Sequence, residues 1–349
     1  MAKVTLQSIA DQVGVSRMTV SNAFSRPDQL SAELRARILT AAEELGYVGP
    51  DPAARALARG RTGSVGLLLN GRLAEAFEDD VSAEFVASVA DELGARGLAL
   101  TLLTPGHAGK EGYVPARDVA VDGALVYTCD PGSPDLDWLA KRGLPIVTVD
   151  QLVREGIPSV NVDDRGGARA AAQHLVELGH TRIGIVTLQD AFTPGPATEL
   201  ATMSRNYPTV ERLRGWHQAL DAAGIEPMTV VAPYTPRDAA GEAARLLLER
   251  DDRPTALLCF SDEFAAASVR VAGALGLSVP GDLSVVGYDD SPLAASLHPP
   301  LTTVHQEITA KGRQAVAAIV TALSGTAPEP VLLPTSLVLR GSTAPPRRR

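Results

Sequence analysis

Aromatic residues and cysteines are both scarce in this chain. Aromatic side chains make up 4% of the 349 residues, so a large core must come from Ala, Val and Leu, which the 45% hydrophobic content can supply. The two cysteines, Cys129 and Cys259, lie far apart, and each ends an apolar run, as expected for buried thiols rather than for a disulfide or a metal pair. We therefore expect two or three domains in a reducing compartment, without a bound metal.

Long apolar runs are missing as well. No stretch approaches the length that spans a bilayer, and the N-terminal MAKVTLQSIADQ lacks the apolar core of a secretion signal. We therefore expect a cytoplasmic protein with no membrane partner.

The motifs of several enzyme classes are absent too. The sequence has no Walker loop, no H-E-x-x-H and no G-x-S-x-G, and its six histidines are scattered. Asp289 and Asp290 are adjacent carboxylates, but neighbouring side chains at a strand end point in opposite directions and cannot share one substrate bond. His180 follows a predicted helix end, where we expect it to cap the helix. We expect neither catalysis nor a cofactor.

Negative charge dominates the chain but not its N-terminal end. The formal net charge is −9. Residues 1–61 hold eight Lys and Arg against six Asp and Glu, a net charge of +2, which leaves 24 against 35, or −11, for the rest. A basic end on an acidic chain favours a polyanionic partner for that end alone.

Two short amphipathic helices are predicted between residues 6 and 24. The two apolar stripes consist of Leu6, Ile9, Ala10 and Val13, and of Val15, Val20, Ala23 and Phe24. Thr5 can cap the first helix and Ser16 the second, and Gly14 permits the tight corner between them, because glycine adopts positive φ without a Cβ clash. This pattern matches a helix-turn-helix, whose second helix enters the major groove of DNA.

The outer face of the second helix has side chains suited to DNA. Arg17 can donate two hydrogen bonds to guanine, Asn22 can pair with adenine, and Met18 can touch a thymine methyl. The hydroxyls that suit phosphate oxygens are those of Ser16, Thr19 and Ser21. A solvated face on a small helical hairpin is the alternative that this stretch alone leaves open.

A third helix is predicted over residues 32–45. Ser31 can cap it and Gly46 ends it. Its apolar stripe consists of Leu34, Ile38, Ala42 and Leu45. Three short helices around one core would form a DNA-binding headpiece, residues 1–48, of a size that folds alone.

Residues 49–63 have the composition of a hinge that contains a short helix. Asp51 and Pro52 favour a helix start, and Gly60 favours its end. Because so short a helix is marginal alone, we expect it to order only against its twin in a dimer and the DNA minor groove, where Leu57 could enter a base step. A plain linker helix is the alternative. The predicted DNA-contacting residues are Thr5, Ser16, Arg17, Met18, Thr19, Ser21, Asn22, Arg55 and Leu57.

From residue 64 onward, short apolar runs alternate with helical stretches. This βαβ pattern indicates parallel sheets covered by helices on both faces, and the number of runs favours two similar lobes with a cleft between them. The strand candidates are residues 65–69, 98–103, 123–128, 145–149, 182–187, 255–260 and 283–288. Ligands of such sheets bind beyond the carboxyl ends of the strands. The polar residues that directly follow an apolar run are Asn70, Asp150, Ser261 and Asp289.

These motifs together resemble a known family. VTLQSIADQVGVSRMTVSNAF, followed by ELGYVGPDPAARALARGRTGSVGLLL, is similar to the headpiece and hinge of the lactose-repressor (LacI/GalR) family of bacterial transcription regulators. The similarity continues in NVDDRGGARAAAQHLVELGHTRIGIV, in ERLRGWHQAL and in PTALLCFSDEFAAASVRVAGALGLSVPGDLSVVGYDDSPLAASLHPPLTTVHQ. Several long motifs in the expected order are more specific than any single pattern.

The resemblance implies a repressor that binds a palindromic operator as a homodimer and is controlled by a small polar effector, a sugar before a nucleobase. Carried over by position, Arg17, Met18 and Asn22 would face bases, and Leu57 would enter the minor groove at the operator centre. Many family members have an arginine in place of Asn22, so the base preferred there would differ. The alternative, a two-lobe carrier of the periplasmic type, has no helix-turn-helix and needs a secretion signal.

In the effector domain the resemblance assigns ligand contacts to individual residues. Arg212 matches the arginine that grips ligand hydroxyls or carboxylates, and Asp289 matches the aspartate that accepts hydrogen bonds from the ligand. Asp150 and Ser261 stand at further contact positions, with Ser261 shorter than the usual asparagine. Phe77 and Tyr234 could stack on a sugar or base ring; a lining role without ligand contact is the alternative for these last four. The predicted effector-binding residues are Asn70, Phe77, Asp150, Arg212, Tyr234, Ser261 and Asp289.

The expected fold is thus an all-α helix-turn-helix headpiece followed by an α/β two-lobe effector domain, residues 64–340, of the periplasmic-binding-protein-like type I. We place the N-lobe at about 64–162 plus 292–325 and the C-lobe at about 163–291 plus 326–340. Residues 341–349, GSTAPPRRR, are expected to form a flexible tail.

Overall fold

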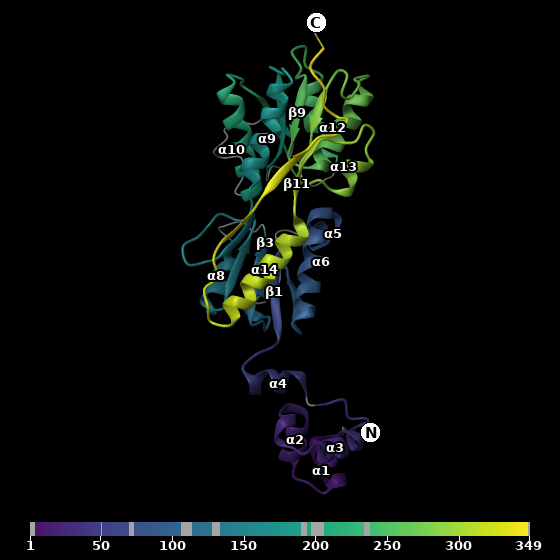
Figure 1. The fold of residues 1–349 in the computed structure, drawn as a ribbon, viewed down its shortest axis with the longest axis vertical. Helices are drawn as coiled ribbons and strands as arrows, with labels where there is room; N and C mark the ends of the chain where they lie inside the picture. The colour runs from purple at the N-terminus through teal and green to yellow at the C-terminus, as the bar shows by residue number, and fades with distance from the viewer. Residues whose placement is uncertain are drawn as a thin grey trace. The chain divides into compact units, whose positions relative to one another are not determined.

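The computed structural model describes residues 4–49, 51–69, 73–105, 114–127, 133–189, 194–196, 206–233 and 238–347. The chain divides after Gly63 into an N-terminal unit and a C-terminal unit (Figure 1). Among the described helices, none combines the length and the hydropathy that crossing a bilayer requires.

The N-terminal unit has the predicted helix-turn-helix. Its elements are α1 (Leu6–Val13), α2 (Arg17–Ser25), a 3₁₀ turn η1 (Pro27–Gln29), α3 (Ala32–Glu44) and α4 (Pro52–Arg59). The hydroxyl of Thr5 accepts a hydrogen bond from the Ser8 N–H, and the hydroxyl of Ser16 accepts one from the Thr19 N–H, so both predicted caps are confirmed. Gly14 has φ of 77°, as the corner requires. The buried core residues are Ile9, Ala10, Val20, Ala23, Ile38, Ala41 and Ala42.

Helix α4 starts and ends as the hinge sequence predicts. The Asp51 carboxylate accepts hydrogen bonds from the N–H groups of Ala53 and Ala54, and Gly60 ends the helix with φ of 65°. Leu57 is 87% exposed. Within its own unit this helix therefore presents its large apolar side chain to a surface.

The C-terminal unit contains a six-stranded sheet, which forms the N-lobe. The strand order is β12-β5-β4-β3-β1-β2, and every pair is parallel. The strands are β1 (Ser64–Leu69), β2 (Ala99–Leu103), β3 (Gly123–Tyr127), β4 (Ile146–Val149), β5 (Ser159–Val162) and β12 (Val331–Leu333). The helices are α5 (Leu73–Glu78), α6 (Asp80–Ala95), α7 (Pro115–Asp118), α8 (Pro134–Lys141) and α14 (Ile308–Leu323). Helices α6 and α14 pack together over one core of this sheet, and α8 packs over a second core.

A five-stranded sheet forms the C-lobe, with the order β10-β9-β6-β8-β7 and β7 as its antiparallel strand. The strands are β6 (Ile183–Leu188), β7 (Gly195–Pro196), β8 (Met228–Ala232), β9 (Ala256–Cys259) and β10 (Ser284–Val286). The helices are α9 (Asp164–Glu177), α10 (Tyr207–Ala222), α11 (Ala239–Leu248), α12 (Asp262–Ala274) and α13 (Pro292–Ser296). Helices α9 and α10 enclose one core with the sheet, and α11 and α12 enclose another. Cys259 is buried in the second of these, as predicted, whereas Cys129 lies outside the described residues.

Two antiparallel strands run between the lobes. Strand β11 (Thr303–Gln306) leads from the C-lobe into α14, and β13 (Thr335–Val338) leads back from β12 (Figure 1). The predicted lobe boundaries are wrong at both of these crossings. Ala294 and Leu301 belong to a C-lobe core, whereas β12 pairs with β5 in the N-lobe sheet. After a first crossing between β5 and α9, the chain therefore changes lobe again at β11, because Leu301 still packs in the C-lobe, and at β13, because β12 pairs with β5 in the N-lobe sheet.

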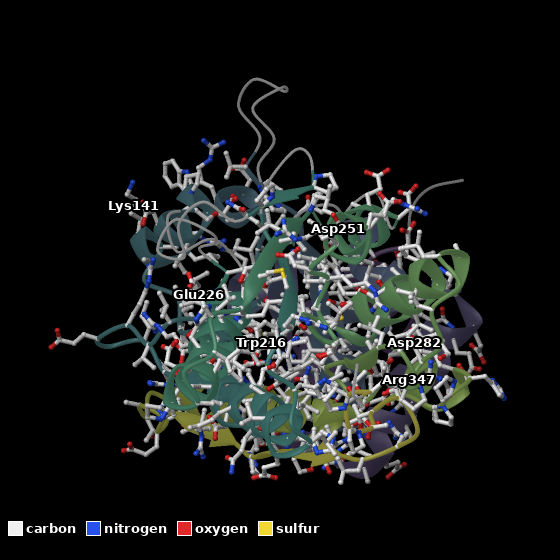
Figure 2. The ribbon with its side chains drawn as sticks, turned by 90° about the horizontal axis from the view of Figure 1, so that it is seen from above. Lys141, Trp216, Glu226, Asp251, Asp282 and Arg347 are labelled. Carbon is white, nitrogen blue, oxygen red and sulfur yellow. The ribbon has the colours of Figure 1, made fainter. Side chains whose placement is uncertain are left out.

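The C-terminal segment is not a free tail up to Arg347. Ser342 is buried, its hydroxyl donates to the Val285 carbonyl at 2.6 Å, and its own carbonyl accepts from the Val285 N–H at 2.9 Å. Arg347 pairs with Asp282 at 2.7 Å, on the side of the molecule where Figure 2 labels both residues. The prediction of a flexible tail is wrong here, because this segment satisfies the backbone groups of β10.

His180 helps to hold the same segment. Its backbone N–H donates to the Leu175 carbonyl and caps α9, as predicted. Its ring is buried and lies within hydrogen-bond distance of Thr255 Oγ1 (2.8 Å), Ser284 Oγ (3.1 Å) and the Ala344 carbonyl (2.9 Å). Burial lowers the pKa of His180, which favours the neutral ring in this position.

Candidate functional site

Helix α2 buries one face and presents the other. Val20 and Ala23 are buried in the headpiece core, whereas Arg17 and the 70% exposed Met18 point away from it. Asn22 is half-buried, and its Nδ2 donates to Gln29 Oε1 at 3.3 Å. The predicted base-reading side chains therefore share the accessible face of one short helix.

The hydroxyls predicted to contact phosphate are partly engaged within the headpiece. Thr5 Oγ1 and Ser8 Oγ lie 3.3 Å apart in a capping box, and Ser16 Oγ lies 2.8 Å from Thr19 Oγ1. These bonds fix the first turns of α1 and α2. Each helix N-terminus is thereby held in a conformation whose N–H groups favour a nearby anion.

One arginine of α2 and one of α4 influence the pKa of the same tyrosine, Tyr47. Burial raises the pKa of Tyr47, and the positive charges of Arg17 and Arg55 lower it in part. Arg55 on α4 and Arg17 on α2 therefore contribute positive potential to one region of the headpiece, which suits a polyanion.

The second candidate site lies where the six-stranded and the five-stranded sheets of the C-terminal unit end. Arg212 projects from α10 and is buried. Its Nε donates to Asp164 Oδ1 at 2.8 Å, one Nη donates to Asp289 Oδ1 at 3.1 Å, and the other donates to the Phe260 carbonyl. The guanidinium lies over the Tyr288 ring, 3.6 Å from its centroid. Arg212 and Asp289, which the sequence analysis assigns to one effector site, therefore lie in direct contact.

The charge state of this group follows from burial and pairing. Burial alone would lower the pKa of Arg212, but Asp289 and Asp164 raise it above its ordinary value. Burial raises the pKa of Asp289 well above its usual range, and the Arg212 charge opposes that rise. Burial likewise raises the pKa of Asp164, and the Arg212 charge opposes that rise. One permanent cation thus holds two buried carboxyl groups.

Asp150 follows β4 and faces a second cation. Its Oδ2 accepts a hydrogen bond from Lys311 Nζ at 2.6 Å, and the Lys311 Nζ also donates to Gln306 Oε1 at 3.1 Å. Gln306 Nε2 donates to Asp289 Oδ1 at 2.7 Å. Asp150 and Asp289 both have positive φ, 51° and 107°, which is uncommon for residues other than glycine and recurs at functional sites.

Three members of this group were not predicted: Asp164, Gln306 and Lys311. The signal for Lys311 is its position, since Ile308, Lys311, Ala315 and Ile319 fall on one buried stripe of α14. A lysine at an apolar stripe position indicates a buried partner. Gln306 and Asp164 carry no comparable signal in the sequence.

The remaining predicted effector residues are less central. Ser261 caps α12, and its hydroxyl accepts from the Phe264 N–H at 3.3 Å. Phe77 lies on α5 and is 53% exposed. Asn70 and Tyr234 lie outside the described residues.

Neighbouring carboxylates at the end of β10 point to different partners, as predicted. Asp289 faces Arg212 and Gln306, whereas Asp290 pairs with His305 at 3.0 Å and with Arg340. Among the described residues, no group of His, Cys, Asp and Glu is placed to hold a metal ion. The arrangement suits reversible binding of a polar molecule.

Two known family models match this chain, one in each of its two units. Residues 5–49 match the model of bacterial regulatory proteins of the lacI family, and residues 172–343 match that of the periplasmic binding protein-like domain. The first match covers the helix-turn-helix. The second covers Arg212, Asp289, Gln306 and Lys311.

The chain is similar to transcriptional regulators over nearly its whole length. The chain is 39% identical to the HTH-type transcriptional regulator IpsA of Corynebacterium glutamicum, with 89% of each chain covered. It is 35% identical to the HTH-type transcriptional regulator CelR of Thermobifida fusca, over 97% of this chain and 98% of the relative. These relatives are transcriptional regulators and not enzymes.

Solved structures share the whole fold. A CelR–cellobiose complex has a TM-score of 0.69 at 31% identity and covers 97% of this chain and all of its own. The lac repressor dimer bound to operator and the anti-inducer ONPF has a TM-score of 0.81 at 25% identity, over 98% of this chain and 99% of its own. The helix-turn-helix, the two-lobe domain and these full-length relatives together show that the chain is a DNA-binding transcriptional regulator and belongs to the lacI family.

Proposed function

We propose that this protein is a repressor that binds a palindromic operator as a homodimer and is released by a small polar effector, a sugar. The observation that carries the proposal is the joining, in one chain, of an accessible second helix of a helix-turn-helix to a buried charged group at the ends of the two lobe sheets. The similar lac repressor is a dimer on operator, and the similar CelR is in complex with cellobiose. The protein would act in the cytoplasm, beside the chromosome.

The recognition helix would read bases with three side chains. Arg17 would donate to a guanine edge, Asn22 would pair with adenine, and Met18 would touch a thymine methyl. Phosphate contacts would come from Thr5, Ser16, Thr19, Ser21 and Arg55. Leu57 would enter a base step at the operator centre, because it is exposed on a short helix that needs a partner.

Effector binding would take place at Arg212, Asp289 and Asp150, with Ser261, Phe77, Asn70 and Tyr234 around them. A ligand that binds one arrangement of the lobes better than another shifts the population toward that arrangement. The lobes connect to the headpiece through the hinge, so the same shift would change the spacing of two hinge helices in a dimer. The ligand thereby changes operator affinity without touching DNA.

Competition binding with a library of inverted-repeat DNA tests the DNA-reading part. We expect selection of one palindromic site, and an Arg17→Ala variant is expected to weaken its binding by about 1–3 kcal/mol because a bidentate base contact is lost. Arg96→Ala, which removes an equal charge from the C-terminal unit, is the matched control and should bind as the parent does. Selection of no site, or equal losses in both variants, would contradict the proposal.

A further inference from the structure

Lys311 is a buried cation at the boundary between the lobes. Its side chain is 1% exposed, and its Nζ lies 2.6 Å from Asp150 Oδ2. The rings of Phe85 and Tyr127 lie near it, with centroids 5.9 and 5.6 Å from Nζ. An ammonium group that is buried in this way stays charged only when it has an anionic partner, so Lys311 and Asp150 form a buried ion pair.

Gln306 connects this pair to the Arg212 group. Its side-chain oxygen accepts from Lys311, and its side-chain nitrogen donates to Asp289. The continuous polar chain runs through Asp150, Lys311, Gln306, Asp289, Arg212 and Asp164. The N-lobe contributes Asp150 and Lys311, and the C-lobe contributes Asp289, Arg212 and Asp164. This row of hydrogen-bonded side chains therefore spans both halves of the candidate effector site.

Both cations in this row of hydrogen-bonded side chains, Lys311 and Arg212, already have carboxylate partners. Lys311 donates to Asp150, and Arg212 donates to Asp164 and Asp289. Three carboxyl groups therefore surround two cations, and the Asp150 charge also raises the pKa of Asp164. A phosphate or a carboxylate entering here would have to displace a carboxylate from a cation while facing the remaining acidic groups.

The acceptors, in contrast, are not all used. Within the described residues, Asp150 Oδ1 and Asp164 Oδ2 are buried oxygens with no hydrogen-bond partner. Both side chains are more than nine-tenths buried, with residue exposures of 3% and 1%. A buried oxygen without a donor is costly, and each lobe contributes one of them. A ligand hydroxyl on each side would satisfy both.

We propose that Lys311 and Asp150 form the N-lobe half of the effector site, and that the site selects an uncharged, hydroxyl-bearing ligand over its phosphorylated or carboxylated derivatives. The inference rests on the proposed function and deepens it. Lys311 occupies one oxygen of Asp150 and leaves the other for a ligand hydroxyl. Arg212 does the same for Asp164.

The thermal stability of the full-length protein tests this selection. The probes are glucose, ribose, cellobiose and other neutral sugars and polyols, each measured beside its phosphate ester and its acid. We expect at least one neutral member to raise the melting temperature and its charged derivatives to raise it by less than a tenth as much at equal concentration. Stabilisation by a charged member without its neutral parent, or by no neutral member at all, would overturn the proposal.

An Asp150→Asn variant tests the residue assignment. It replaces an acceptor oxygen by an amide and removes one negative charge, so we expect at least tenfold weaker binding of the neutral ligand and a smaller preference over its phosphate. Asp252→Asn, an exposed position outside this group, is the matched control. An unchanged affinity and an unchanged preference in Asp150→Asn would overturn the assignment.

Lys311→Met tests the cation itself. It leaves Asp150 buried without a partner and can fail to fold, so the double variant Asp150→Asn/Lys311→Met, which removes both charges, accompanies it. We expect the double variant to bind operator normally and to lose the neutral ligand; retention of wild-type ligand affinity would overturn the role of the pair. Operator selection is measured in the same samples, so loss of DNA binding in the parent would contradict the proposed function and not this inference.

Discussion

At the scale of single residues, Arg212 is a buried cation of the C-lobe that has several partners. It donates to Asp164, to Asp289 and to the Phe260 carbonyl, and all three residues are buried. Removing one partner of a buried ion pair leaves the other charges without compensation. Arg212 is therefore expected to support folding as well as ligand binding.

Arg212→Ala should lower the free energy of unfolding by about 3–5 kcal/mol, because Asp164 and Asp289 would remain buried without their cation. Denaturant unfolding of the full chain measures this loss. Arg214→Ala is the matched control on the same helix, since the Arg214 side chain is 57% exposed, and an exposed pair contributes less than about 1 kcal/mol. Equal losses in the two variants would show that Arg212 is not a structural cation.

Asp262 gives the stability a pH dependence. Burial raises its pKa to about 6, although hydrogen bonds from Thr303 and Ser291 lower it in part. The folded state therefore holds a proton that the unfolded state releases near pH 4. The resulting stability is complete below that pH and is lost as the pH rises through about 6, by up to about 3 kcal/mol.

Asp262→Asn should remove this part of the pH dependence, because an amide does not titrate. Urea midpoints between pH 4 and pH 7 measure it in the parent and in the variant. The parent should show the steeper decline over this range. A parallel decline in both proteins would contradict a raised pKa at Asp262.

At the scale of elements, α4 is a short helix with local signals at both ends and an exposed leucine between them. Asp51 and Gly60 define its ends, but eight residues are too few for a stable isolated helix. A partner that covers Leu57 would stabilise it. The hinge helix is therefore the element best placed to couple folding to operator binding.

Leu57→Ala should keep the fold and weaken binding of the specific operator by about 1–3 kcal/mol, because the wedge and its packing are lost. Fluorescence anisotropy with labelled operator measures the change. Val48→Ala, at another exposed apolar position of the same unit, is the control and should leave the affinity unchanged. An unaltered affinity in Leu57→Ala would contradict the role of the hinge helix.

The C-terminal segment behaves as part of the C-lobe. Ser342→Ala removes a buried hydroxyl that donates to the Val285 carbonyl and accepts from the Thr302 N–H at 2.8 Å. We expect a loss of about 1–3 kcal/mol in the free energy of unfolding, because two backbone groups lose their partner. A melting temperature equal to that of the parent would contradict this role.

The elements that could be predicted from the sequence are those specified locally. Caps at Thr5, Ser16 and Asp51 lie within three residues of the groups they satisfy, so the headpiece and hinge follow from short patterns. The lobe crossings depend on pairing between distant strands, as in β12 with β5. The partnership of Lys311 with Asp150 spans 161 residues, and no local pattern specifies it.

At the scale of the whole molecule, a DNA-binding headpiece and a two-lobe domain with a candidate effector site belong to one polypeptide. The two lobes of the C-terminal unit are joined by the connection from β5 to α9, by β11 and β13, and by the side-chain hydrogen bonds of Gln306. A ligand that rearranges these hydrogen bonds changes how the two lobes are arranged. The ratio of its affinities for the two lobe arrangements sets how far the equilibrium between free and operator-bound protein can shift. The size of that shift is the physical limit of the regulation.

The most direct test is a titration of full-length protein with a labelled inverted-repeat operator, in the presence of excess random DNA, with and without the stabilising neutral sugar or polyol. The account predicts preference for the inverted repeat by at least about a thousandfold and a loss of that preference when the ligand is added. Equal binding to the inverted repeat and to random DNA, in both conditions, would contradict it.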